Sequence, residues 1–305
     1  MSSSIHQVQQ RPVQAIGLML ISVFLFSAMD VIFKILVENY SSMQVVFFRC
    51  ALSMPLFLAW VLLTGPRQLK TDYPFGQLAR GLLGLGMLYA TGECFREMQL
   101  ADAYALFFAS PLLITLLSGP LLGEPAGMAR IVASVVGFSG VLIVLNPSVD
   151  RWLGYGATMG MIAVVLYAIS SLLLRRLGRR DSTVSITFWF IFLVGLGAGL
   201  LSIPGWKHVD SDDWLLLVAL ALTGTGGQIL ITAAFRRAPA AIVAPFDYTH
   251  MLWAVIFGYL LWGYLPGLQT WVGSAVLVLS GLFILYRENR AATRQRRAQS
   301  ESRYR

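Results

Sequence analysis

SAMDVIFKILVENYSSMQVVFFR occupies residues 27–49 and joins two long apolar runs through a short polar turn. An apolar run of about 20 residues has the length of a transmembrane helix. This stretch nevertheless places Asp30, Lys34 and Arg49 inside the two runs. Each charge in such a run costs about 2.5–3.5 kcal/mol on insertion scales. Charges kept at that cost need partners, so these three residues are the first candidates for a functional site.

The composition is that of a membrane protein. Hydrophobic residues make up 57% and charged residues 12% of the 305 residues, whereas a soluble chain contains about 25% charged residues. We therefore predict an all-α integral membrane protein with ten transmembrane helices and no soluble domain. The ten apolar segments cover residues 15–37, 43–63, 75–96, 102–122, 129–146, 154–175, 184–203, 213–235, 240–262 and 267–286.

The distribution of Lys and Arg predicts the orientation. With a cytoplasmic N-terminus (residues 1–14), 18 of the 23 Lys and Arg residues fall on the cytoplasmic side, three lie in external loops and two are intramembrane. Seven of them are arginines in the basic tail, residues 287–305, which indicates a membrane-surface anchor and no nucleic-acid binding. We expect a multi-pass protein of the bacterial inner membrane with both termini in the cytoplasm.

Residues 140 positions apart resemble one another through both halves of the chain. Phe48 corresponds to Phe188, and the pair FR at 95–96 corresponds to FR at 235–236. Each half holds five predicted spans, and an odd number of spans makes the second half run opposite to the first. Inverted repeats are the usual build of secondary transporters, with the solute site near mid-membrane between the halves. The predicted repeats are residues 15–146 and 154–286.

Three stretches carry a family resemblance: VVFFR at 45–49, SPLLITLLSGPLLGE at 110–124 and APFDYTHMLWAVIFGYLLWG at 244–263. With them the chain resembles a member of the drug/metabolite transporter superfamily with two EamA-type halves. The resemblance implies the fold and transport, but not the solute, because this superfamily moves amino acids, cofactors, nucleotide derivatives and metallophores in either direction. One position departs from the pattern: such halves often end in Gly-Glu, and the second half has Gly263-Tyr264.

The first group of polar candidates lies in the outer half of the predicted membrane region. Because a helix rises about 1.5 Å per residue, Asp30, Lys34 and Arg49 lie at a similar depth below the turn near residues 38–42. Asp30 and Lys34 share a helix face at i, i+4. Glu93, with Tyr89 one turn away, comes close to the same level in the third span. Two acids and two bases balance in charge, which suits a charged or zwitterionic solute.

Two interpretations of this group stay open. It is a solute site or an outer gate, or it is a static salt-bridge brace, because intramembrane charges must pair. The uncharged counterparts favour function, since a brace required by the fold would occur in both halves. The counterparts in the second half are Ser170, Leu174, Trp189 and Ala233.

A second group lies near the predicted mid-membrane level of the ninth span. Asp247 and His250 share a face at i, i+3, and an Asp–His pair can carry a proton. The alternative is a hydrogen-bonded structural pair. Tyr248 beside them and Gln228 in the eighth span are further candidate solute ligands. We find no nucleotide-binding loop, metal-ligand set or nucleophile–base pair, and expect no cofactor, no metal and no enzymatic activity.

These features predict a secondary active transporter that moves a small charged or zwitterionic organic metabolite by alternating access. We expect export of an amino-acid-derived metabolite or metallophore. The alternatives are uptake of a vitamin or cofactor such as riboflavin or S-adenosylmethionine and, from another class, a membrane sensor or intramembrane enzyme without flux. The expected partners are the solute, the lipid bilayer, a coupling proton and, in a homodimer, a second copy of the chain.

Overall fold

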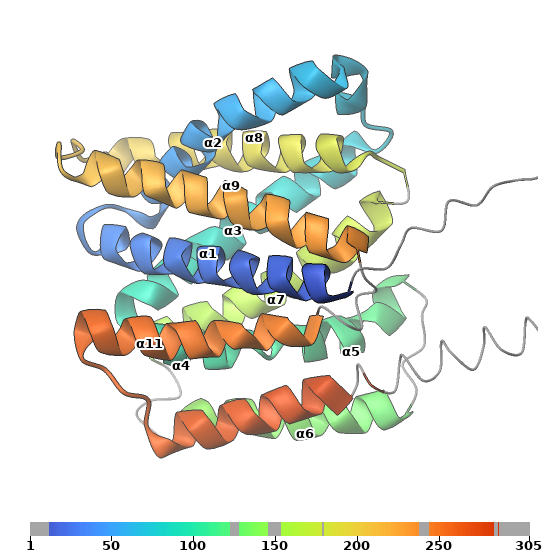
Figure 1. Ribbon diagram of the computed structural model, residues 1–305, viewed down its shortest axis with the longest axis vertical. Helices are drawn as coiled ribbons and strands as arrows, with labels where there is room; N and C mark the ends of the chain where they lie inside the picture. The colour runs from blue at the N-terminus through green and yellow to red at the C-terminus, as the bar shows by residue number, and fades with distance from the viewer. Residues whose placement is uncertain are drawn as a thin grey trace, which may run out of the picture.

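The computed structural model describes residues 12–122, 128–145, 154–178, 180–237, 244–283 and 286. These residues form a bundle of helices and no strand (Figure 1). Six helical segments among them are long and apolar enough to cross a membrane, judged by length and composition. The predicted N-terminal segment up to residue 11 and the basic tail at 287–305 lie outside the described residues.

The helices of each half follow the predicted apolar segments. Those of the first half are α1 (Pro12–Asn39), α2 (Ser42–Thr64), η1 (Pro66–Leu69), α3 (Pro74–Glu97), α4 (Leu100–Phe107), α5 (Ser110–Leu122) and α6 (Met128–Leu145). Those of the second half are α7 (Tyr155–Leu177), α8 (Thr183–Ser202), η2 (Ile203–Gly205), α9 (Asp213–Arg237), η3 (Ala244–Thr249), α11 (His250–Trp262) and the apolar helix Leu268–Phe283.

Short polar residues and glycine set several helix ends. Ser41 precedes α2, and its side chain accepts a hydrogen bond from the Gln44 N–H at 3.2 Å. Ser182 caps α8 in the same way through the N–H of Ser185. These are N-caps, which satisfy backbone donors that have no partner inside the helix. Gly263 ends α11 in the left-handed conformation, with φ 62°, which only glycine adopts without strain.

The two halves pack on one another in a reciprocal way. α1 packs on α9 and α3 packs on α7, while α2 meets α8 and α4 meets α11; Figure 1 shows α1 between α9 and α11. Under the sequence repeat α1 corresponds to α7 and α3 to α9, so the first two contacts are equivalent. The described structure therefore repeats its inter-half contacts as the sequence repeat predicts.

The halves also run in opposite directions. The Arg96 guanidinium near the end of α3 donates to the carbonyls of Val37 and Tyr40, so α1 and α3 finish together at what we call the turn end. A Cβ placed on Gly156 would lie 2.6 Å from the Cβ of Glu97, so α7 begins at that same end. α1 finishes where α7 starts.

Two of the predicted spans are interrupted near their middle. The span predicted at 102–122 is α4 followed by α5, with a break at Phe108–Ala109, and the span predicted at 240–262 contains the 3₁₀ helix η3 before α11 begins at His250. These breaks occupy corresponding positions in the two repeats. The rings of the counterparts Phe108 and Tyr248 touch, with centroids 5.2 Å apart and planes at 73°. A residue that touches its own counterpart lies on the axis that relates the two halves.

The position that departs from the Gly-Glu pattern has a polar role at the turn end. The Tyr264 hydroxyl donates to the carboxylate of Asp102 at 2.6 Å, and the Thr270 hydroxyl donates to the same carboxylate at 2.7 Å. Asp102 lies in the first turn of α4. A glutamate at position 264 would place a second carboxylate beside Asp102, so tyrosine suits this contact and the usual residue does not.

α6 and the helix Leu268–Phe283 cross with their backbones in contact. A Cβ on Gly273 would lie 2.5 Å from the carbonyl oxygen of Gly140, too close for any side chain unless the backbone shifts. Glycine at both positions allows this approach, as at other tight crossings of membrane helices.

We expect Gly273→Ala to destabilise the protein by about 1–3 kcal/mol, the usual cost of overpacking. The measurement is thermal unfolding of the purified chain in detergent. Gly267→Ala is the matched control, because a Cβ there meets no atom within 4 Å. Equal melting temperatures for the two variants would contradict the close crossing.

The opposite end of the bundle is tied between the halves by Asp181, in the segment between α7 and α8. Its carboxylate accepts hydrogen bonds from the Thr71 hydroxyl, the Asp72 N–H at 2.8 Å and the Gln77 amide at 2.7 Å. Burial raises the pKa of Asp181, but these hydrogen bonds outweigh burial and set the pKa below its ordinary value. The ionised carboxylate therefore stabilises the folded state.

We expect Asp181→Asn to lower the melting temperature at pH 7 and to matter less in acid. Because the folded pKa is depressed, the stabilisation is complete above the unfolded value of about 3.9 and is lost as the pH falls through the folded pKa. Melting curves of both proteins between pH 7 and pH 3 measure this. Asp212→Asn, at an exposed position, is the control, and a difference that does not change with pH would contradict the assignment.

Candidate functional site

The centre of the bundle holds a set of polar side chains near the midpoint of α1. Ser27 and Asp30 lie one turn apart on this helix. The Tyr104 hydroxyl of α4 donates a hydrogen bond to the Asp30 carboxylate. Ser27 hydrogen-bonds to Nδ1 of His250 at 2.8 Å and interacts with the Tyr104 hydroxyl. α1, α4 and α11 are thus linked by side chains at the level of the two helix breaks.

His250 connects this set to Asp247. The imidazole stacks on the Tyr104 ring with centroids 5.2 Å apart and planes at 19°, and its Nε2 lies 3.7 Å from Oδ1 of Asp247. The His250 side chain is 13% exposed and that of Asp247 is 58% exposed. Asp247 also acts electrostatically on Tyr167 of α7, itself an exposed side chain. The polar set therefore runs from an accessible carboxylate into the interior.

Arg49 of α2 completes the central group, which we define as Ser27, Asp30, Arg49, Tyr104, Asp247 and His250. The guanidinium is half-buried and its charge acts on Asp30. A Cβ on Gly224 of α9 would lie 3.6 Å from Nε of Arg49, which is ordinary van der Waals contact, so the guanidinium lies beside α9. Within the described residues Arg49 makes no hydrogen bond and no ion pair with another side chain.

Lys34 does not join Asp30, although both lie on the same helix face. Its buried Nζ donates to the carbonyls of Phe95 and Met98, the latter at 2.8 Å, and lies 5.6 Å from the centroid of the Trp262 ring. These carbonyls are at the end of α3, where helical carbonyls lack partners in the helix. Lys34 thus caps α3, and no ion pair joins it to Asp30 in the described part of the chain.

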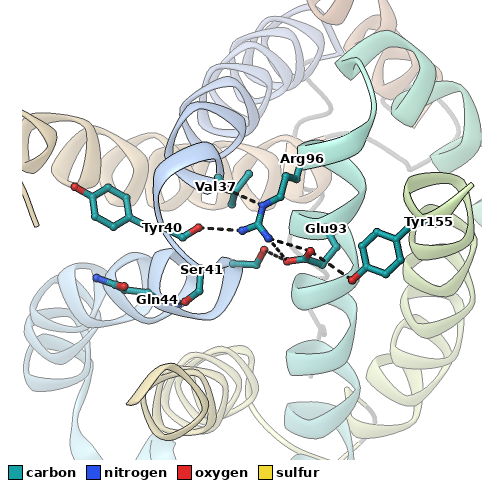
Figure 2. A network of polar contacts seen from close by, with 8 residues as sticks. Val37, Tyr40, Ser41, Gln44, Glu93, Arg96 and Tyr155 are labelled. Carbon is teal, nitrogen blue, oxygen red and sulfur yellow. Dashed lines mark hydrogen bonds and ion pairs between the residues drawn. The ribbon is translucent and has the colours of Figure 1, made fainter. Parts of the chain in front are cut away.

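Glu93 belongs to another arrangement at the turn end, shown in Figure 2. Nη1 of Arg96 lies 3.1 Å from both carboxylate oxygens of Glu93. The same guanidinium donates through Nε to the Val37 carbonyl at 2.9 Å and through Nη2 to the Tyr40 carbonyl at 3.0 Å. Arg96 thereby holds the last turn of α1 on α3.

The Glu93 carboxylate extends this network to two further helices. It accepts a hydrogen bond from the Ser42 hydroxyl of α2 at 2.7 Å. It accepts another from the Tyr155 hydroxyl of α7 at 3.4 Å (Figure 2). Tyr155 also hydrogen-bonds to Tyr89. We call Ser42, Tyr89, Glu93, Arg96 and Tyr155 the turn-end network.

The structure thus divides the predicted candidates. Asp30, Arg49, Asp247 and His250 come together, whereas Lys34, Tyr89 and Glu93 lie in contacts at the turn end. Tyr248 packs on Phe108 at the helix breaks, and the exposed side chain of Gln228 makes no hydrogen bond in the described part of the chain. Sequence reasoning did not select Ser27, Tyr104 or Arg96 as site residues. The i, i+3 spacings of Ser27 with Asp30 and of Glu93 with Arg96 are the signals that could have found two of them.

The contrast between Lys34 and Arg49 predicts opposite effects on stability. Lys34→Met leaves helix-end carbonyls without partners, which costs about 1–3 kcal/mol per buried group. Arg49→Met removes an intramembrane charge without a partner, so stability stays the same or rises. Thermal unfolding in detergent compares the two. If Arg49→Met destabilised the protein as much as Lys34→Met, Arg49 would be a brace.

Comparison with known proteins adds to this geometry. The model of the EamA-like transporter family matches residues 13–146 and 154–287. A riboflavin transporter of Vibrio cholerae is 30% identical over 270 residues, which cover 85% of this chain and 90% of that protein. An S-adenosylmethionine uptake transporter of Rickettsia conorii is 27% identical over 93% of this chain and 96% of its own length.

Two further similarities differ in what they show. A pseudopaline exporter of Pseudomonas aeruginosa is 28% identical over 262 residues, which cover 84% of this chain and 90% of the exporter. A solved crystal structure matches with a TM-score of 0.63 at 17% identity, over 92% of this chain and 99% of that one. At this identity the likeness to the crystal structure shows the fold alone.

Proposed function

Because the chain belongs to the EamA-like transporter family, we propose that it is a secondary active transporter of a small charged or zwitterionic organic metabolite. Its relatives are transporters that belong to bacteria, and its apolar helices are those of a multi-pass membrane protein. The proposal includes ten spans in two inverted halves, both termini in the cytoplasm and alternating access between the halves. A homodimer stays a prediction.

The observation that supports the proposal is that Arg49 has no bonded side-chain partner among the described residues. A guanidinium in the interior of a membrane bundle needs an anionic or polar partner, and the described side chains supply none within bonding distance. Arginine binds a carboxylate with two parallel hydrogen bonds. Asp30, on which Arg49 acts electrostatically, would receive an ammonium group of the same solute on the carboxylate oxygen that does not accept the Tyr104 hydroxyl. The pair therefore suits a molecule with both charges, such as an amino-acid derivative.

The two ends of the central group differ in access. On the turn side, the Lys34 contacts and the turn-end network close the space between α1, α3 and α7. On the other side the Asp247 side chain is 58% exposed. These contacts support a state in which the solute enters from the end opposite the turn. Lys34, Tyr89 and Glu93 then act as an outer gate, while Gln228 and Tyr248 remain proposed contacts.

The names of the relatives bear on the solute. S-adenosylmethionine and pseudopaline, named in two of them, carry amino and carboxylate groups, which fit Asp30 and Arg49; riboflavin is uncharged and planar. We propose export of an amino-acid-derived metabolite or metallophore, with uptake of S-adenosylmethionine or riboflavin as the alternative. A sensor or an intramembrane enzyme is less consistent with the three relatives described above, which are named as transporters or as an exporter.

Flux in liposomes tests the proposal. The purified full chain is reconstituted, and exchange of radiolabelled S-adenosylmethionine, riboflavin and pseudopaline is measured in each direction. Exchange of none of them would argue against this solute class, and a preferred direction under an ion gradient separates export from uptake.

We expect Arg49→Met to weaken binding of a carboxylate-bearing solute by about 30-fold or more. Removing one partner of a buried charge pair costs about 2 kcal/mol or more, and about 1.4 kcal/mol corresponds to tenfold in affinity. Arg67→Met, at an exposed position in η1, is the control. The measurement is the concentration dependence of exchange, and an unchanged half-saturation concentration would remove Arg49 from the site.

A further inference from the structure

The hydrogen bonds of the central group share one direction. With the proton of neutral imidazole on Nδ1, His250 donates to the Ser27 oxygen. The Ser27 hydroxyl is then free to donate toward the Tyr104 oxygen, with which it interacts, and the Tyr104 hydroxyl donates to the Asp30 carboxylate. Beyond His250 lies Asp247, 3.7 Å from Nε2. His250, Ser27 and Tyr104 thus form one run of donors that ends on the Asp30 carboxylate, and the carboxyl group of Asp247 lies beyond its other end.

The two carboxylates differ in environment. Asp247 is 58% exposed, whereas the hydroxyl that binds Asp30 belongs to the buried Tyr104. The two carboxylates also come from different halves of the chain, Asp30 from the first and Asp247 from the second. Their counterparts under the sequence repeat are Ser170 and Phe107, so the symmetric fold does not demand this chain of bonds.

We propose that Ser27 and Tyr104 relay a proton between Asp247 and Asp30, so that the charge on Asp30 follows the aqueous phase that Asp247 faces. This inference rests on the proposed function, because it supplies a coupling route for the same solute site. It assigns roles to Ser27 and Tyr104, to which neither the family resemblance nor the family match gives a role.

The proton transfer balances along the chain of bonds. Protonated Asp247 gives its proton to Nε2 of His250, directly or through one water, while Nδ1 releases its proton to the Ser27 oxygen. Ser27 passes its own proton to Tyr104, and Tyr104 passes its own to Asp30. Asp247 ends as a carboxylate, Asp30 ends neutral, and the three residues between them regain their starting charge.

The consequence for transport follows from competition at Asp30. A neutral Asp30 no longer attracts the ammonium group of a solute, so proton arrival favours solute release and proton loss favours solute binding. Among the described residues, the other charged or titratable groups that act on this chain are Arg49 of α2, Tyr167 of α7 and Tyr248 of η3. α9, which packs on α1, carries charged side chains only at its two ends in the described residues.

Tyr104→Phe tests the relay, because it removes the hydroxyl and keeps the ring that stacks on His250. The variant is reconstituted into liposomes and followed with radiolabelled S-adenosylmethionine or pseudopaline, whichever the unmodified chain exchanges, because the coupling depends on the amino group of the solute. Two assays are run: exchange at equal pH on both sides, and accumulation driven by an imposed pH gradient. We expect accumulation to fall to the level of protein-free liposomes and exchange to fall by a much smaller factor, because Asp30 and Arg49, the proposed solute ligands, are kept.

Ser27→Ala should show the same split, because it breaks the chain of bonds one step earlier. Tyr259→Phe makes the Tyr104 substitution on an exposed side chain of α11 and should leave both assays unchanged. Loss of both assays in both relay variants would show a structural role and overturn the relay, as would retained accumulation. Exchange by the unmodified chain without any response to the pH gradient would overturn the relay but not the transport function. Absence of exchange by that chain would overturn both.

Discussion

Inside the hydrocarbon core a polar group has no water to bind, so it must find a partner in the protein. Lys34 and Arg96 meet this requirement at the turn end, where each cation binds carbonyls left free at the end of a helix. Arg49, deeper in the bundle, has no such partner in the described structure. The difference between satisfied and unsatisfied cations separates the residues that hold the bundle together from those available to a solute.

Hydrogen bonds tie the second half to both ends of α3. At one end Asp181 joins the segment before α8 to the start of α3, and at the turn end Tyr155 joins α7 to Glu93 of α3. The interrupted helices α4–α5 and η3–α11 lie elsewhere in the bundle and carry Tyr104 and His250. The central group thus takes residues from the interrupted segments, while hydrogen bonds join the halves at both ends of α3.

Much of the fold follows from the apolar runs and the regular spacing of the repeat, which locate the helical segments and the family without any contact information. Rise per residue predicts the depth of Asp30 and Arg49, and the structure brings both into the central group. Depth does not give the direction in which a long side chain extends. Depth alone therefore groups Lys34 with Asp30, although the Lys34 ammonium reaches the end of α3. The bonds of Tyr104 depend on packing between segments far apart in the chain, which periodicity does not encode. Pro111 and Pro245 lie close to the helix breaks, but neither indicates how the broken ends meet.

The touching rings of Phe108 and Tyr248 have a historical consequence. In an antiparallel dimer of a single five-helix chain, a residue on the two-fold axis would meet its own copy. Fusion of two such genes would keep that contact and free the two copies to diverge. Phe108 and Tyr248 still touch here. Elsewhere the corresponding residues of the two repeats differ in charge, as Lys34 corresponds to Leu174 and Arg49 to Trp189. The contact on the axis is thus the one that would persist from a symmetric ancestor. Charges such as Arg49, which occur in only one half, would have arisen after the two halves diverged in sequence.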